Sequence, residues 1–306
     1  MALVTLFIPL LMMILTTSNW FYFWALMEIV SMSVVLFITS KNKLFSENAM
    51  TLFIIQAVSG LLILVGGTYV QAFSSNGLLW VTLLLGILLK LGLAPLHFWV
   101  LPLMGQLDYI SIFFVLGPAK IPPLSLLCLN FSYQIVLFFS LFSMITGSLL
   151  GLKVTNVKSI IGASSITHTG WVFFSNLCNF MWSYFTIYLM STFFLLVSLS
   201  KNQDLLSGLN LLSMSGLPPF GLFLAKVYLL SVLMMYFNPF FVVILLVTAL
   251  LSLYFYLKFA YKYWLKSMNS KILSMKGVYI LGMTHMLTAV LCIFFYGWDS
   301  SIKFLI

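Results

Sequence analysis

The chain has 306 residues, of which 63% are hydrophobic and 6% are charged, and its formal net charge is +9. Soluble domains usually contain about 45–50% apolar and about 25% charged residues, so this composition excludes a soluble fold. The positive charge does not indicate a nucleic-acid partner, because every basic residue is a lysine and most lysines lie in short loops between apolar runs. We therefore predict an integral membrane protein.

The apolar runs predict an all-α membrane protein of about eleven transmembrane helices. An apolar run of about 18 or more residues can cross the hydrocarbon core as one helix, and these runs lack the strict apolar/polar alternation of transmembrane strands. The first run has no basic n-region and no cleavage site, so we expect a retained helix and not a signal peptide. In chain order, the helices are expected at 2–17, 20–40, 47–71, 78–99, 109–131, 133–151, 157–177, 181–200, 206–236, 239–261 and 277–298.

The loop lysines test this helix count. If eleven helices alternate through the membrane, only Lys303 falls on one face, and all other loop lysines fall on the opposite face. These are Lys41, Lys43, Lys153, Lys158, Lys201, Lys262, Lys266, Lys271 and Lys276. One helix more or fewer would scatter them over both faces, so the count agrees with the positive-inside rule. The N-terminus is then expected on the lysine-rich face, cytoplasmic or matrix, and the C-terminus on the other.

Prolines interrupt the fourth and the ninth predicted helices, at Pro95 in KLGLAPLHF and at Pro218 and Pro219 in SGLPPFGLFLAK. Proline frees a backbone carbonyl, which lipid tolerates only where the break faces protein or water. Breaks at matching positions of two halves are typical of transporters with inverted repeats, and a period of five helices inverts the second half. We predict one transmembrane domain, 1–306, with five-helix repeats at 1–132 and 133–266 and a C-terminal helix at 277–298.

Four charged residues lie near the middle of predicted helices: Glu28, Lys90, Lys120 and Lys226. A lysine at the centre of a bilayer costs about 2.5–3.5 kcal/mol on insertion scales, so these groups must be paired, hydrated or neutral for part of the time. Burial disfavours a charged lysine and a nearby carboxylate favours it, so such groups suit a proton relay. The structural alternative is snorkelling of the side chain to the interface, which we expect for Lys258.

The histidines add groups that titrate near neutral pH. His168 lies mid-helix in SSITHTGW, between hydroxyl residues that can hold water, and is either a relay member or a histidine bonded to one backbone carbonyl. For His97 and His285 we favour a structural role.

No other site chemistry is indicated by the sequence. Cys128, Cys178 and Cys292 stand singly in apolar stretches, so we expect core residues and neither disulfides nor a metal site. Nucleotide-binding, zinc-protease and serine-hydrolase motifs are absent, and the histidines do not form a haem pair.

Several stretches resemble the antiporter-like subunits of respiratory complex I, and among them the chain 2 subunits of mitochondrial NADH:ubiquinone oxidoreductase. They cover most of the chain, from residue 23 to residue 264, in family order. The stretches are FWALMEIVSMS, KLGLAPLHFWV, AKIPPLS, GLKVTNVKSIIGASSITHTGW, SMSGLPPFGLFLAKVY and ALLSLYFYLKFAYKYW.

This resemblance implies a role for each buried charge. Glu28 and Lys90 look like the charge pair of the family, Lys120 like its central lysine, His168 like part of its hydrated axis and Lys226 like the lysine of its second broken helix. Bacterial relatives have fourteen helices and animal versions lack the first three, in agreement with the count of eleven.

The resemblance also implies a setting and a function. The chain would be a proton-translocating subunit of the enzyme in the mitochondrial inner membrane, with the N-terminus on the matrix side and the C-terminus on the intermembrane side. Its partners would be lipids and other membrane-arm subunits, including antiporter-like ones. FMN, iron–sulfur clusters and ubiquinone would be held by other subunits, with no cofactor and no redox centre here.

The sequence departs from the family pattern at two places. The glutamate that usually follows HFWVP is missing from LPLMGQLD, and Pro118 replaces an aromatic residue, which would bend the fifth helix near Lys120.

Two alternative functions remain open. The first alternative is a subunit of a stand-alone cation/proton antiporter, which shares the fold and the charges. The second, a membrane-embedded transferase, would need acidic or histidine residues clustered at one interface, and the sequence shows none.

Overall fold

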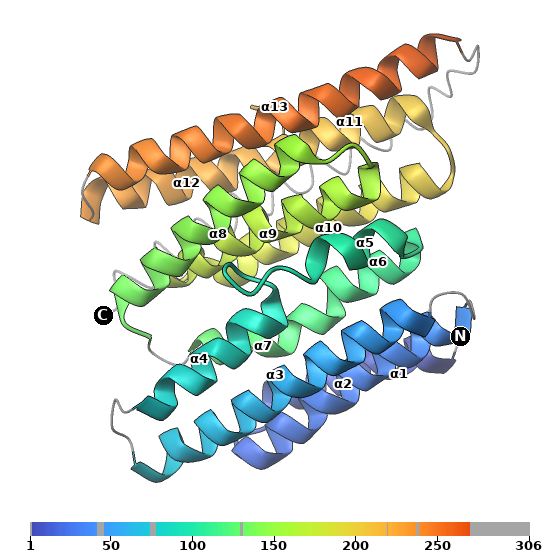
Figure 1. Cartoon of the computed structure of the whole chain (residues 1–306). Helices are drawn as coiled ribbons and strands as arrows, with labels where there is room; N and C mark the ends of the chain where they lie inside the picture. Colours follow the sequence, from blue (N-terminus) through green and yellow to red (C-terminus); the bar gives the residue numbers. More distant parts are fainter. Residues whose placement is uncertain are drawn as a thin grey trace. The chain divides into compact units, whose positions relative to one another are not determined.

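The computed structural model describes residues 2–41, 46–73, 78–128, 131–218, 220–236 and 239–269. The helix predicted at 277–298 lies outside these ranges, as do Pro219, His285 and Cys292. The described residues form helices and turns, without a strand (Figure 1). The α-helices are α1 (Ala2–Thr16), α2 (Trp20–Lys41), α3 (Ser46–Phe73), α4 (Leu78–Leu91), α5 (Val100–Gln106), α6 (Tyr109–Leu116), α7 (Ile121–Ser125), α8 (Tyr133–Lys153), α9 (Val157–Ser175), α10 (Met181–Ser200), α11 (Asp204–Ser215), α12 (Gly221–Tyr236) and α13 (Pro239–Asn269).

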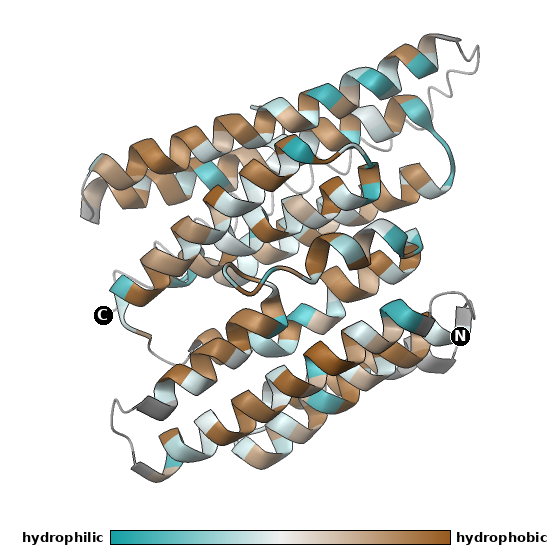
Figure 2. Ribbon diagram, viewed as in Figure 1, coloured by the Kyte–Doolittle hydropathy of each residue, from teal (hydrophilic) through white to brown (hydrophobic). Residues whose placement is uncertain are grey.

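Five of these helices are long and apolar enough to cross a membrane. The candidate spans are Trp20–Ser40, Glu47–Ala72, Tyr133–Lys153, Met181–Ser200 and Pro239–Met268. Figure 2 shows the helices coloured mostly as hydrophobic along their length, with isolated hydrophilic positions. The chain is therefore an all-helical, multi-pass membrane protein.

The predicted helix at 109–131 is wrong as a continuous element. The chain forms α6, a 3₁₀ helix η2 (Pro118–Lys120), α7 and a second 3₁₀ helix η3 (Leu126–Cys128). Gly117 leaves the helical conformation at φ −100° and ψ −90°, and the amide of Lys120 donates to the carbonyl of Gly117 at 2.9 Å. Pro118 has no amide to continue the α-helix, whereas Pro122 and Pro123 lie in the first turn of α7, where a missing amide is tolerated.

The chain also leaves the α-helix near Pro95 and near Pro218. Between α4 and α5, Gly92 takes φ +70° and the Ala94–Pro95 peptide bond is cis. Between α11 and α12, Gly216 takes φ +79° and ends α11 in the left-handed conformation that favours glycine.

The helix α13 continues to Asn269, beyond the predicted end at 261. Its last turn contains Lys266, and a lysine near a helix C-terminus is favourable.

The chain divides into two compact units. The first contains Met1–Ser132 and Lys158–Thr169, and the second contains Tyr133–Val157 and Gly170–Ile306. In the first unit, α3 makes its most extensive contact with α4 and also packs on α2. In the second unit, α11 packs on α13 and α10, and α13 also packs on α8. Glu28, Lys90, Lys120 and His168 belong to the first unit and Lys226 to the second.

Glycines allow α3 and α4 to approach closely. A Cβ atom at Gly66 of α3 would lie 2.5 Å from the backbone nitrogen of Leu83 in α4. A Cβ atom at Gly86 of α4 would lie 2.7 Å from Cγ1 of Ile63 and 2.9 Å from the backbone oxygen of Ser59 in α3. Small residues at such contacts are typical of helix pairs in membranes, where van der Waals packing holds the helices together.

The substitution Gly66→Ala is expected to destabilise the protein by about 1–3 kcal/mol, because the new methyl group meets backbone atoms that cannot rotate away. The measurement is the midpoint of thermal unfolding in detergent. Thr68→Ala is the matched control, because Thr68 lies two residues along on an exposed face of the same helix. Equal midpoints for the two variants would contradict a close α3–α4 contact.

Candidate functional site

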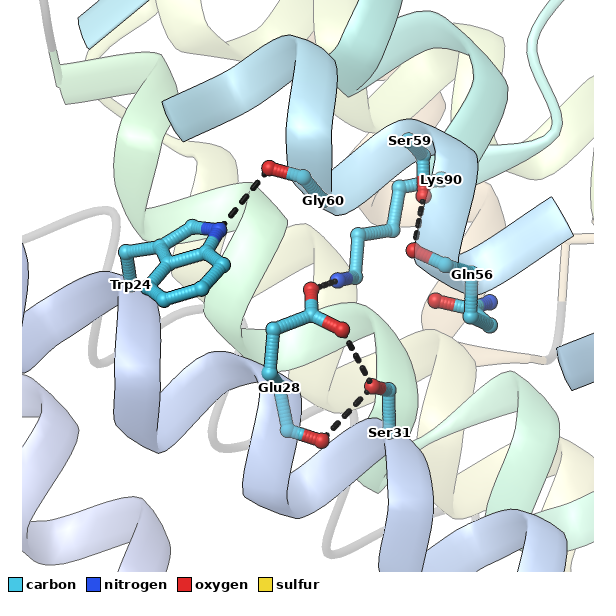
Figure 3. A network of polar contacts seen from close by, with 7 residues as sticks. All are labelled: Trp24, Glu28, Ser31, Gln56, Ser59, Gly60 and Lys90. Carbon is cyan, nitrogen blue, oxygen red and sulfur yellow. Dashed lines mark hydrogen bonds and ion pairs between the residues drawn. The ribbon is translucent and has the colours of Figure 1, made fainter. Parts of the chain in front are cut away.

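Glu28 of α2 and Lys90 of α4 form a buried ion pair. The Lys90 Nζ lies 2.6 Å from Oε1 of Glu28, and the two side chains are 1% and 16% exposed, respectively (Figure 3). The Ser31 hydroxyl lies 2.8 Å from the Glu28 carbonyl and 3.3 Å from its Oε2, and donates within this group. The negative charge of Glu28 therefore compensates the positive charge of Lys90, although the two residues are 62 positions apart in the sequence.

One face of α3 lies against this ion pair. Gly60 contacts the Glu28 carboxylate so closely that a Cβ atom at this position would overlap it. The Trp24 indole donates to the Gly60 carbonyl at 2.8 Å and ties α2 to α3 beside the pair. Residues 56, 59 and 60 share this face because helix neighbours are three and four positions apart, and Figure 3 shows all three around the pair.

Gln56 was not among the predicted site residues. It is 4% exposed, and its Oε1 has no hydrogen-bond partner in the described part of the chain. The signal that could have found it is a carboxamide in the middle of the apolar run 47–71, four residues before Gly60.

Lys120 is a buried lysine of a different kind. It ends η2, is 3% exposed, and its Nζ has no hydrogen-bond partner among the residues that the structure describes. The surrounding elements belong to the first unit, where η2 contacts α2 and α7 contacts α4. A buried amine without a partner is unfavourable in its charged form, so this site suits a group that binds and releases a proton.

His168 lies in the part of α9 that belongs to the first unit, and it is 2% exposed. The neighbouring hydroxyls are also buried, and they donate within their own helix, Thr167 to the Ser164 carbonyl at 2.8 Å and Thr169 to the Ser165 carbonyl at 2.7 Å. Their protons are therefore engaged, and only their oxygen lone pairs remain for a water molecule.

Lys226 of α12 lies at the interruption between α11 and α12. It is 6% exposed, donates to the Ser215 carbonyl at 3.0 Å, and lies 5.9 Å from the centre of the Trp171 ring. Ser215 is the last residue of α11, and the carbonyls of a last turn have no partner within the helix. A cation is favourable both at this negative end and over an aromatic face, so the amine has a defined site in the second unit.

The other predicted residues differ in their exposure. Pro95 and Pro218 are exposed at the helix interruptions, and His97 is half-buried. Lys258 is exposed on α13, and Cys178 is buried. Within the described ranges no group of three or more histidine, cysteine or acidic residues is placed to hold a metal ion.

Comparisons with known proteins agree with this fold. A family model described as NADH:quinone oxidoreductase/Mrp antiporter, transmembrane region, matches residues 17–202. In solved structures, respiratory complex I from Thermus thermophilus contains a chain with a TM-score of 0.72 at 22% identity, covering 82% of this chain and 67% of that one. A chain of the Mrp complex from Dietzia has a TM-score of 0.76 at 14% identity, covering 84% and 59%, respectively. The protein is thus of the antiporter-like membrane class.

The sequence relatives are more specific. NADH-ubiquinone oxidoreductase chain 2 of Albinaria caerulea is 34% identical over 271 residues, which cover 86% of this chain and 87% of that one. The same subunit of Anopheles gambiae is 31% identical over 274 residues, which cover 81% and 80%. The chain belongs to the NADH-ubiquinone oxidoreductase chain 2 family.

Proposed function

We propose that this chain is a proton-translocating core subunit in the membrane arm of NADH:ubiquinone oxidoreductase. The observation that carries the proposal is the pair of unlike lysine sites in the first unit. Lys90 is compensated by Glu28 at 2.6 Å, whereas Lys120 is buried with no hydrogen-bond partner among the described residues. The Lys90 site is therefore suited to a fixed charge, and the Lys120 site is suited to an amine that binds and releases a proton.

The Glu28–Lys90 pair is the control element of the proposed mechanism. While the pair is closed, the carboxylate offsets the charge of Lys90, and Lys120 can hold a proton. When events in other subunits open the pair, the uncompensated ammonium repels a second positive charge in the same low-dielectric unit. Lys120 then releases its proton.

His168 and Lys226 are the proposed next carriers. His168 is buried between hydroxyl oxygens that can accept hydrogen bonds from water, and Lys226 has the site described at the end of α11. Moving one charge against 100 mV requires about 2.3 kcal/mol, which is within the range of changes in electrostatic interaction between buried charges. Redox chemistry takes no part on this chain: FMN, iron–sulfur clusters and ubiquinone are assigned to other subunits.

The proposed topology follows from the loop lysines and the interruptions. The chain would cross the mitochondrial inner membrane eleven times, with the N-terminus in the matrix and the C-terminus on the intermembrane side. The repeats 1–132 and 133–266 would each contain one broken helix, the fourth and the ninth, at Pro95 and at Pro218 and Pro219. The division of the chain after Ser132 supports the boundary between the repeats, whereas Lys158–Thr169 of the second repeat belongs to the first unit. Lipids and other membrane-arm subunits, antiporter-like ones among them, would surround the chain.

A subunit of a stand-alone cation/proton antiporter is the second candidate. It is favoured by the likeness to the Mrp complex, whose TM-score of 0.76 slightly exceeds that of complex I. The identity of 31–34% with chain 2 subunits over most of both chains favours the first candidate.

The test is a native gel of membranes from the source mitochondria, solubilised in mild detergent and stained for NADH dehydrogenase activity. Mass spectrometry then locates this chain. We expect it in the active band of complex I. Migration in a band without NADH activity would overturn the proposal and leave the independent antiporter.

A further inference from the structure

We infer that Gln56 is a positioning residue that provides a second hydrogen-bond acceptor for the Lys90 ammonium when the Glu28–Lys90 pair opens. The inference rests on the proposed function, because it concerns how that pair changes state. It assigns a role to a side chain outside the set of buried charges.

Hydrogen-bond donors and acceptors are mismatched at the Glu28–Lys90 pair. A lysine ammonium has three N–H donors, and in the described part of the chain Lys90 uses one of them, toward Oε1 of Glu28. Gln56 contributes a buried amide oxygen that has no hydrogen-bond partner among the same residues. Buried polar atoms are nearly always hydrogen-bonded, so spare donors and a spare acceptor on one side of the pair point to an alternative bond between them.

The side-chain amide of Gln56 is oriented toward the pair. Figure 3 shows the amide oxygen of Gln56 on the side of the group that faces Lys90 and Glu28, with its nitrogen on the far side. The backbone carbonyl of Gln56 accepts a hydrogen bond from the Ser59 hydroxyl at 2.8 Å, within the same turn of α3. This hydrogen bond stays within α3 and uses the backbone of Gln56. The side-chain amide of Gln56 is therefore available to bind a neighbouring residue.

The Glu28 carboxylate is held more firmly than the Lys90 ammonium. Gly60 lies against the carboxylate, and the Ser31 hydroxyl lies 3.3 Å from its second oxygen. Lys90, by contrast, reaches the pair through a four-carbon side chain. Rotation about these bonds moves the ammonium from Glu28 toward Gln56 without a change in the backbone, and the neutral amide accepts the cation with less electrostatic attraction than the carboxylate. Gln56 thus makes the open state of the pair accessible.

The experiment compares Gln56→Leu with Gln56→Glu in the assembled complex. Leucine removes the acceptor, whereas glutamate retains one that attracts the ammonium more strongly, so we expect NADH:ubiquinone turnover and proton translocation per assembled complex to fall about tenfold in the first variant and by less in the second. Gln134→Leu, at an exposed position of α8, is the matched control and is expected to change neither rate.

Each outcome decides between roles. Equal impairment by leucine and glutamate would show a packing role for Gln56, and unchanged rates in Gln56→Leu would show that the Lys90 ammonium needs no acceptor at this position; either result overturns the inference. If Gln56→Leu does not assemble, Gln56→Met gives the same test with a flexible side chain. The double variant Glu28→Gln/Lys90→Met tests the proposed function separately. If it translocates protons normally, the proposed function fails; if it is inactive while Gln56→Leu is normal, only the inference fails.

Discussion

Replacing Lys120 with methionine is expected to reduce NADH-driven proton translocation at least about tenfold while the complex still assembles. Methionine has a similar length and no ionisable group, so the substitution removes the proton carrier and leaves the volume filled. The amine is 3% exposed without a hydrogen-bond partner in the described chain, so removing it also removes a desolvation cost of about 2.5–3.5 kcal/mol on insertion scales. Function and stability are expected to change in opposite directions.

The measurement is acidification by vesicles that contain the variant complex, normalised to the complex assembled on a native gel. Lys201→Met is the control, because it removes a lysine that is exposed at the end of α10. Full proton translocation in the Lys120 variant would show that this amine does not carry protons. A loss of assembly in the same variant would show that the lysine is paired and stabilising.

Breaking the buried pair is expected to have the largest effect on stability. Glu28→Gln removes the negative partner and leaves the Lys90 charge buried, which typically costs about 3–5 kcal/mol. The amount of assembled complex should therefore fall. In the double variant Glu28→Gln/Lys90→Met no charge remains, so assembly is expected to recover although proton translocation does not.

The chain contains its own control for this experiment. Lys266 and Asp204 form the other ion pair of the described residues, with N–O at 3.1 Å and a lysine side chain that is 66% exposed. Asp204→Asn should cost only about 0–1 kcal/mol, because solvent screens an exposed pair. Quantitative native gels and thermal inactivation of the three variants provide the comparison. A similar loss for Glu28→Gln and Asp204→Asn would contradict a buried, energetically coupled pair.

The helices could be predicted from apolar run length because backbone groups in lipid must be satisfied within each segment. The ends of α2, α8 and α10 lie within two residues of their predicted positions. The division at 116–118 was harder to predict, because one proline can either kink a helix or end it. Here the helix α6 ends, because Gly117 leaves the helical conformation and its carbonyl accepts a 3₁₀ hydrogen bond from the amide of Lys120.

The candidate site could be predicted in part for a similar reason. Charges within apolar runs are costly, so Glu28, Lys90, Lys120 and Lys226 stand out in composition alone. The pairing of Glu28 with Lys90 was suggested by family resemblance, since contacts between helices far apart in sequence do not follow from periodicity. The carbonyl that Lys226 contacts depends on where α11 ends.

The reciprocal glycines of α3 and α4 have a mechanical consequence. Gly66 receives Leu83, and Gly86, one turn before Lys90, receives Ile63, so each helix blocks the sliding of the other along its axis. The backbone of α4 therefore keeps a constant register against the α3 face that carries Gly60. A signal that opens the ion pair has two remaining routes, a displacement of α2 or a rotation of the Lys90 side chain. Trp24 also ties α2 to α3 beside the pair, which leaves the rotation of the Lys90 side chain as the route that needs no movement of a helix backbone.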